Sequence, residues 1–189
     1  VIFIDFLRAL RVPVKRVLKG ILRANRFLYR ANPEYEHCRM IDLKAFYCGR
    51  DVTCSRELTD EIRRNAADTV ARANALLERA GFAHVCTVNS GWRPRQINAA
   101  TPNASATSHH LTGRAVDLPA PDRTLAKWCV NNLAVLGEIG LWLEDPRWTH
   151  DVNGEHWVHV QTVPPRSGNR VFVPSSAPAL DPDFPVTWA

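Results

Sequence analysis

The sequence predicts an α+β fold in which helices flank a small, mainly antiparallel sheet. Two segments, 59–80 and 124–136, place apolar residues at helical spacing, and short β-type runs lie between turn residues. Of the 189 residues, 46% are hydrophobic and 23% are charged, as in soluble globular proteins. This length allows one domain with an appendage, and no internal repeat is visible.

The stronger helix prediction begins at Thr59, a residue type that caps helix N-termini. Asp60 and Glu61 follow in the first turn, where acidic side chains are stabilised by the helix dipole. Gly81 stands where a C-terminal cap belongs. The apolar positions at helical spacing are Ile62, Ala66, Val70, Ala73 and Leu77. A second, single helix is predicted over 124–136.

Four short segments are typical of strands. Residues 85–88 lead into the turn at 89–94, and residues 115–118 end before Pro119. Residues 141–143 and 156–162 complete the predicted set. Sheet and helices together define a predicted domain over 58–173.

The flanking segments differ in composition from this domain. Residues 1–57 are predicted to be a basic amphipathic arm with an irregular lead-in, and 174–189 an extended, proline-rich tail. Basic residues crowd 1–31, which contributes to the net charge of +5. We expect this arm either to dock to an anionic surface or partner protein, or to pack on its own domain. It lacks the aromatic interleaving of stacking platforms, so we expect no nucleic-acid partner.

Two further expectations concern the cell compartment and the cysteines. No apolar run reaches 18 residues, and charge follows the first apolar run, so we expect neither a membrane-spanning helix nor a signal peptide. The five cysteines contain no CxxC pair. Cys86 and Cys129 are expected to be buried thiols; Cys48 and Cys54 either form a bridge or stay reduced, and the state of Cys38 is open.

The stretch 108–117 carries the chemistry. It places His110 and Asp117 seven residues apart around Gly113, which permits a tight turn that brings both side chains to one point. His159, on a later predicted strand, can supply a third ligand. Five of the seven histidines lie between residues 109 and 159. Three ligands from separate segments, with a fourth position for water, are typical of catalytic zinc.

These motifs resemble a known family. Ser-x-His-x-x-Gly-x-Ala-x-Asp, preceded by Ser-Gly-Trp-Arg and followed by Trp-Val-His-Val, is similar to zinc D-Ala-D-Ala carboxypeptidases and phage L-alanyl-D-glutamate endolysins. The resemblance covers about 58–173 and implies the fold that these enzymes share with the hedgehog signalling domain. It implies one catalytic zinc ion held by His110, Asp117 and His159.

The resemblance also implies roles in substrate binding. Arg93 matches the family arginine that binds a substrate carboxylate or steadies an oxyanion, a task that suits its paired donors. Ser108 is expected to form a hydrogen bond within the metal loop. Gln96 and Asn98 are further candidates for contacts with substrate amides.

The general base departs from the family pattern. Many relatives carry Glu or Asp three residues before the last zinc histidine, where this chain has His156. Glu155 lies one residue earlier, and strand alternation would place it on the face of His159, so Glu155 is favoured over His156. Asp145 and His150 are more distant candidates.

The function implied is a zinc-dependent peptidase that cleaves an amide bond in peptidoglycan stem peptides, of the D,D-carboxypeptidase or L-Ala-D-Glu endopeptidase type. We expect a phage lysin or virion-associated lysin, made in the bacterial cytoplasm and acting on the cell wall. Its basic arm would then meet the wall or other virion proteins. The alternative is a non-catalytic, zinc-stabilised structural module of a phage particle.

Overall fold

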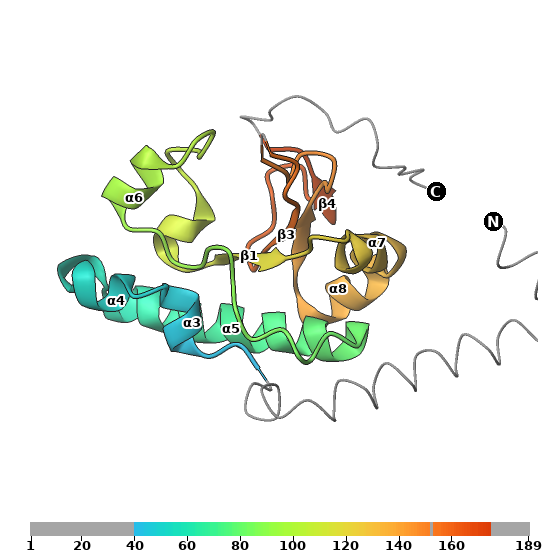
Figure 1. Cartoon of the computed structure of the whole chain (residues 1–189), viewed down its shortest axis with the longest axis horizontal. Coiled ribbons are helices and arrows are strands. Elements are labelled where there is room, and N and C mark those ends of the chain that lie inside the picture. The colour runs from blue at the N-terminus through green and yellow to red at the C-terminus, as the bar shows by residue number, and fades with distance from the viewer. Residues whose placement is uncertain (1–39, 152, 175–189) are drawn as a thin grey trace, which may run out of the picture. The chain divides into compact units, whose positions relative to one another are not determined.

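The computed structural model describes residues 40–151 and 153–174. Its described part has six α-helices, two short 3₁₀ helices and a four-stranded sheet, which confirms the α+β class (Figure 1). The helical elements are α3 (Leu43–Tyr47), α4 (Arg50–Thr53), η2 (Ser55–Glu57), α5 (Asp60–Ala80), α6 (Arg95–Ala100), η3 (His109–Thr112), α7 (Thr124–Asn131) and α8 (Leu133–Ile139). The strands are β1 (Ala115–Pro119), β2 (Trp142–Glu144), β3 (Trp157–Gln161) and β4 (Val171–Phe172).

The sheet has the strand order β1-β3-β2-β4. β3 pairs antiparallel with both β1 and β2, and β4 joins β2 in parallel, so the sheet is mixed but mostly antiparallel. The register places Asp117 opposite His159. Because side chains alternate along a strand, this pair shares one face while their neighbours point to the other.

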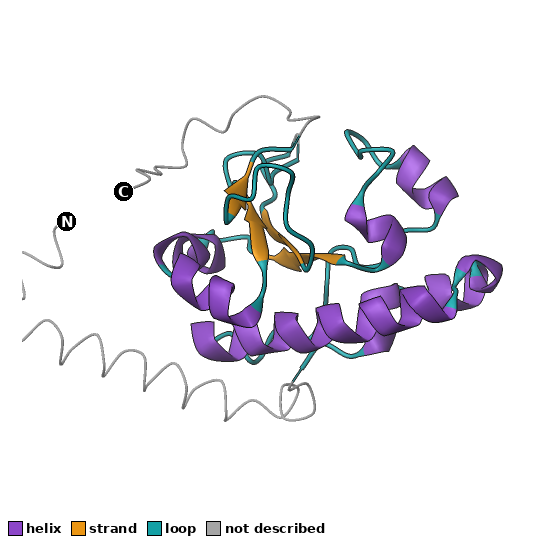
Figure 2. Ribbon diagram, turned by 180° about the vertical axis from the view of Figure 1, so that it is seen from behind, coloured by secondary structure: helices purple, strands orange, loops and turns teal. Residues whose placement is uncertain are grey.

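The other face of the sheet forms the core against α5 (Figure 2). Strand residues in this core are Val116, Leu118, Leu143, Val158 and Val160, and the α5 residues are Ala66, Val70, Ala73, Leu76 and Leu77. The caps of α5 are those that the sequence predicts. Thr59 Oγ1 accepts a hydrogen bond from Ile62 N at 3.2 Å, and Gly81 ends the helix in the left-handed region. Capping and amphipathic spacing therefore fix this helix locally.

Residues 40–57 are more ordered than the predicted irregular lead-in. They form α3, α4 and η2, and Ile41, Phe46 and Tyr47 are buried in the main core. Asn74 of α5 holds this segment by accepting from Ile41 N at 2.9 Å and donating to Ile41 O at 2.8 Å. The core therefore begins well before residue 58. The predicted arm over 1–31 and all but the first residue of the predicted tail over 174–189 lie outside the described residues.

Two predictions of secondary structure are wrong. Residues 85–88 form no strand; only Ser90 bridges to Asp117, with Asn89 N donating to Asp117 O at 2.8 Å. The predicted helix over 124–136 is two helices, α7 and α8, because Asn132 leaves the helical conformation at φ −132° and ψ 40°. Its side chain donates to Trp128 O at 2.8 Å, and its carbonyl accepts from the first turn of α8.

The cysteines divide into two groups. Cys86 is disulfide-bonded, which corrects the expectation of a buried thiol. Cys48, Cys54 and Cys129 are free, and Cys129 is fully buried as predicted. Within 40–151 and 153–174, no helix has the length and apolar character needed to cross a membrane.

Candidate metal centre

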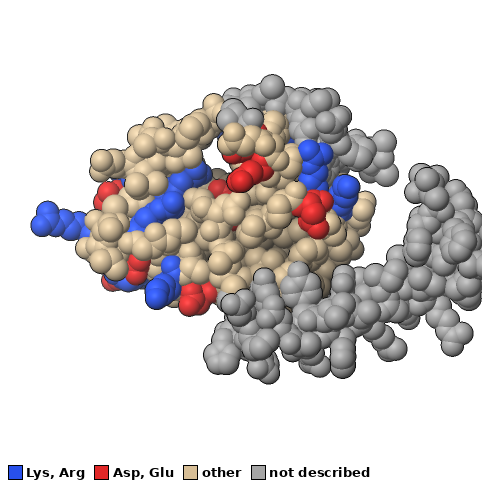
Figure 3. All heavy atoms as spheres, in the orientation of Figure 1, with Lys and Arg blue, Asp and Glu red and all other residues tan. Residues whose placement is uncertain are grey.

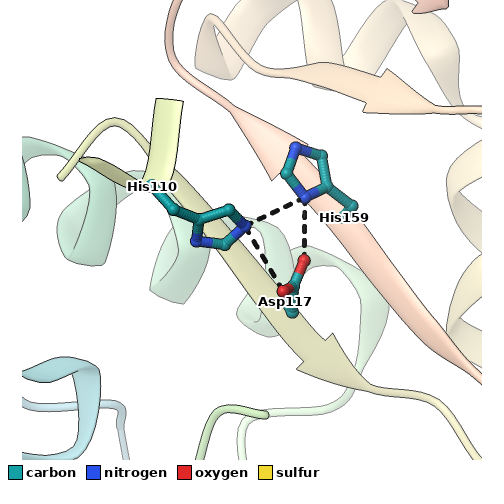
Figure 4. A group of neighbouring side chains, drawn as sticks. All are labelled: His110, Asp117 and His159. Atoms are coloured by element: carbon teal, nitrogen blue, oxygen red, sulfur yellow. Dashed lines mark hydrogen bonds and ion pairs between the residues drawn. The ribbon is translucent and has the colours of Figure 1, made fainter. Parts of the chain in front are cut away.

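His110, Asp117 and His159 meet on the face of the sheet opposite the core (Figure 4). His110 Nε2 lies 3.3 Å from His159 Nδ1 and 3.3 Å from Asp117 Oδ2. His159 Nδ1 lies 2.8 Å from Asp117 Oδ1. Three ligand atoms from a short helix and two strands therefore converge on one point.

The loop that carries His110 is held from both ends. Ser108 Oγ accepts from His110 N at 3.4 Å, which confirms the predicted hydrogen bond within this loop. Gly113 ends η3 at φ 71°, a conformation that favours glycine, and an added Cβ would lie 3.0 Å from Ile62 O. Thr69 Oγ1 donates to Gly113 O at 2.8 Å. The turn before Asp117 is thus anchored directly on α5.

A backbone carbonyl sets the proton position on His110. His110 Nδ1 lies 2.6 Å from Gly91 O, and a carbonyl only accepts, so Nδ1 carries the proton. Nε2 then directs its lone pair at the other two ligands. The ring is fully buried, and burial lowers the pKa of His110, which favours the neutral form that binds metals.

The remaining two ligands form an ion-pair arrangement. Burial would raise the pKa of Asp117, but the adjacent His110 and His159 outweigh it and hold that pKa well below its usual range. Burial would likewise lower the pKa of His159, but the carboxylates of Glu144 and Asp117 raise it. Asp117 is therefore the permanent negative charge of the site.

The donor set fits zinc. Zinc–nitrogen and zinc–oxygen bonds of about 2.0–2.1 Å in a tetrahedron separate ligand atoms by about 3.3–3.4 Å. Two of the three separations here are 3.3 Å and the third is 2.8 Å. Two imidazoles and one carboxylate also leave a fourth position for water or substrate, as in catalytic zinc sites.

The face of the molecule is hollowed between the segment that carries α6 and the loops beside β3 and β4 (Figure 3). Basic side chains stand on one wall of this hollow and acidic side chains on the other (Figure 3). Asp117 and His159 each keep 9% of their surface exposed, whereas His110 keeps none. Solvent therefore reaches the centre past Asp117 and His159.

Arg93, the predicted substrate-binding residue, lies beside the metal centre. Its backbone N donates to His110 O at 3.0 Å, and its Nη2 donates to Ser108 Oγ at 3.3 Å. Its Nε is buried without a hydrogen-bond partner among the described residues. Burial lowers the pKa of Arg93, and Asp117 and Glu144 counteract this effect. The guanidinium thus retains a free donor next to the cluster.

Neither Asn98 nor Gln96 contacts His110, Asp117 or His159 among the described residues. Asn98 is buried, and its Nδ2 donates to Ser105 O at 2.9 Å, which supports the loop after α6. Gln96 is exposed on α6. Asn98 instead lines a cavity of about 820 Å³ between α6, η3 and the start of α5.

The two predicted bases occupy different surroundings. β3 begins at Trp157, and Gly154 turns the chain at φ 78°, so strand alternation does not apply to Glu155. Glu155 is exposed, and its carboxylate makes no hydrogen bond or ion pair among the described residues. His156 is buried, with Nε2 2.7 Å from Arg123 Nη2.

The more distant candidates are engaged elsewhere. Asp145 accepts from Arg147 N at 3.0 Å and pairs with the Arg147 guanidinium, Nη2 to Oδ2 at 2.6 Å. His150 Nδ1 lies 3.2 Å from Asp151 O. Neither contact leads to the metal centre.

Sequence reasoning missed Glu144. Its Oε2 lies 3.9 Å from His159 Nε2, and its side chain is 16% exposed. Burial raises the pKa of Glu144, which the nearby His159 partly offsets. The missed signal was an acidic residue directly after the apolar run 141–143, which extends that strand by one residue into the site.

No protein family, curated protein or solved structure matches this chain.

Proposed function

We propose that this protein is a zinc-dependent peptidase that hydrolyses an amide bond in peptidoglycan stem peptides. The observation that carries the proposal is the His110–Asp117–His159 cluster, whose ligand atoms lie within 4.8 Å of one another. The motifs around these residues support the choice of substrate through their resemblance to zinc cell-wall peptidases. On this proposal the chain acts as a phage lysin or virion-associated lysin.

The proposed reaction assigns different roles to the metal ligands and to Arg93. His110, Asp117 and His159 would hold the ion, and bound zinc supplies Lewis acidity that polarises a carbonyl and activates water. Arg93 binds a substrate carboxylate or the developing oxyanion, because its buried Nε–H is a hydrogen-bond donor that has no partner among the described residues. The leaving amine departs protonated.

The proton acceptor in this proposal is Glu155. Its carboxylate is exposed and makes no hydrogen bond or ion pair among the described residues, so it is free to accept a proton from water. The imidazole of His156 is already 2.7 Å from the guanidinium of Arg123, which competes for its lone pair. Glu155 is therefore preferred to His156 as a base.

Mass spectrometry of muropeptide digests tests the proposal. Zinc-loaded protein is expected to cleave a stem peptide, and the product masses identify the bond. His110→Ala should abolish both zinc binding and cleavage, and Glu155→Gln should lower kcat by about 10²–10⁴-fold while zinc stays bound. A folded, zinc-loaded protein that leaves all wall types intact would refute the peptidase and support the structural module.

Arg93→Lys tests the substrate contact separately. Lysine keeps the positive charge but loses the paired donors, so we expect KM to rise about tenfold or more. Arg56→Lys is the matched control, because Arg56 is exposed on η2 and has no place in the site. Equal KM values for the two variants would remove Arg93 from substrate binding.

A further inference from the structure

Three charged or metal-binding side chains form one row across the sheet. Asp117 on β1 is opposite His159 on β3. The pairs Trp142–Gln161 and Leu143–Val160 continue in register to set Glu144 of β2 opposite the same His159. Side chains at directly opposed positions share a face, so His159 lies between two carboxylates.

These two carboxylates contact different nitrogens of the His159 ring. Asp117 Oδ1 lies 2.8 Å from Nδ1, and Glu144 Oε2 lies 3.9 Å from Nε2. When Nδ1 serves as a metal ligand, the ring proton must sit on Nε2, the nitrogen that faces Glu144. The terminal torsion of a glutamate is soft, so a small rotation brings its oxygen within hydrogen-bond distance.

The remaining side of the ring is packed by an aromatic residue. Phe172 of β4 pairs with Glu144 in the sheet, and its ring meets that of His159 edge to face at 6.1 Å between centroids. The His159 ring therefore has an apolar neighbour that cannot accept its proton. Among the described contacts of Nε2, the Glu144 carboxylate is the acceptor.

We propose that Glu144 is a positioning residue of the metal centre: it accepts the Nε2–H of His159 and holds the ring so that Nδ1 faces the ion. This inference rests on the metal site of the proposed function, but it does not depend on the peptide bond that is cut. Carboxylates that orient a metal-bound histidine raise its basicity and fix its tautomer. Their removal typically weakens metal affinity by about 10–100-fold.

Zinc competition with a chromophoric chelator measures the effect directly in the full chain. Glu144→Ala is expected to weaken zinc binding by about 10–100-fold. The zinc affinity of Glu144→Gln should lie between those of Glu144→Ala and the wild type, because the glutamine amide oxygen still accepts the proton but carries no charge. Glu138→Gln on α8 is the control, since that side chain is 62% exposed and pairs with Arg79.

Proton NMR supplies a readout that a merely structural role would not move. In the zinc-loaded wild type, the Nε2–H of His159 should give a slowly exchanging low-field resonance, and Glu144→Ala should lose it. If Glu144→Ala does not fold, Glu144→Gln decides the question, because its neutral amide oxygen accepts more weakly: zinc affinity should fall and the resonance should shift to higher field. Wild-type affinity together with an unchanged resonance in either folded variant would overturn the proposal.

The test separates this inference from the proposed function. A wild type that binds zinc but cleaves nothing refutes the peptidase while the affinities of the Glu144 variants still decide the positioning role. A wild type that binds no zinc refutes both.

Discussion

The two metal-binding histidines are oriented by different acceptors. His110 is held through Nδ1 by the carbonyl of Gly91, whereas His159 faces carboxylates at both ring nitrogens. A carbonyl fixes the tautomer without adding charge, and a carboxylate also favours positive charge on the ring. Burial lowers the pKa of both rings; at His110 it prevails over the attraction of Asp117, whereas at His159 the carboxylates of Glu144 and Asp117 outweigh it.

A single buried thiol gives a prediction of pH dependence. Burial raises the pKa of Cys129 to about 12, from about 9 for an exposed thiol. Between these values the unfolded chain releases a proton that the folded chain keeps, so stability falls as pH rises above about 9. From pH 8 to pH 10.5 this residue should cost about 2 kcal/mol, measured by urea unfolding.

Cys129→Ala supplies the comparison. The variant begins less stable because it leaves a cavity, but its stability should fall less between pH 8 and pH 10.5. Parallel pH profiles for the two proteins would contradict the prediction.

At the scale of elements, the metal loop depends on a helix far from it in sequence. Gly91 lies against the end of α3, where an added Cβ would overlap the carbonyl oxygen and ring of Phe46. The carbonyl of Gly91 also orients His110. Gly91 therefore takes part both in the packing of α3 and in the orientation of the metal ligand His110.

Gly91→Ala should disturb both the packing of α3 and the orientation of His110. We expect a loss of about 1–3 kcal/mol in the free energy of unfolding, with weaker zinc binding because Gly91 O shifts. Urea unfolding and chelator competition measure the two effects. Gly168→Ala is a surface control, since a Cβ there meets no atom within 4 Å, although its positive φ adds some backbone strain. Unchanged zinc affinity in Gly91→Ala would separate α3 from the metal centre.

Elements with local signals were the ones that sequence reasoning predicted. Thr59 and Gly81 bound α5 by interactions within one turn, and the turn at Gly113 is likewise local. Residues 85–88 have a strand-like composition but pair with no strand among the described residues, because pairing depends on a second segment and not on local composition. Glu144 was missed for the same reason: its role comes from β3, fifteen positions away, and not from its neighbours in sequence.

At the scale of the whole molecule, the core joins both ends of the described chain. Ile41, Phe46 and Tyr47 belong to the same cluster as Val158 and Val160. Composition did not show this, because short helices with few apolar residues give no periodic pattern. The segment 40–57 is therefore part of the domain and not an attachment to it.

Two truncations test this view. A chain that starts at residue 58 loses Phe46 and Tyr47, and removal of one such aromatic side chain costs about 3–5 kcal/mol against a typical stability of 5–15 kcal/mol. We expect it to lack a cooperative thermal transition by circular dichroism. A chain that starts at residue 37, and so keeps all five cysteines, should keep one. Cooperative unfolding of the shorter chain would show that the core is complete without α3.

The sequence positions of the three ligands set the order in which the centre can form. His110 and Asp117 lie in the adjacent elements η3 and β1, but His159 joins them only when β3 has paired with β1. Pairing of segments so distant along the chain is a late event in folding, because loop closure must precede it. The rate of metal uptake in a refolding experiment would therefore report the rate at which the sheet assembles. A chain still emerging from the ribosome would have no metal centre until residue 159 was available.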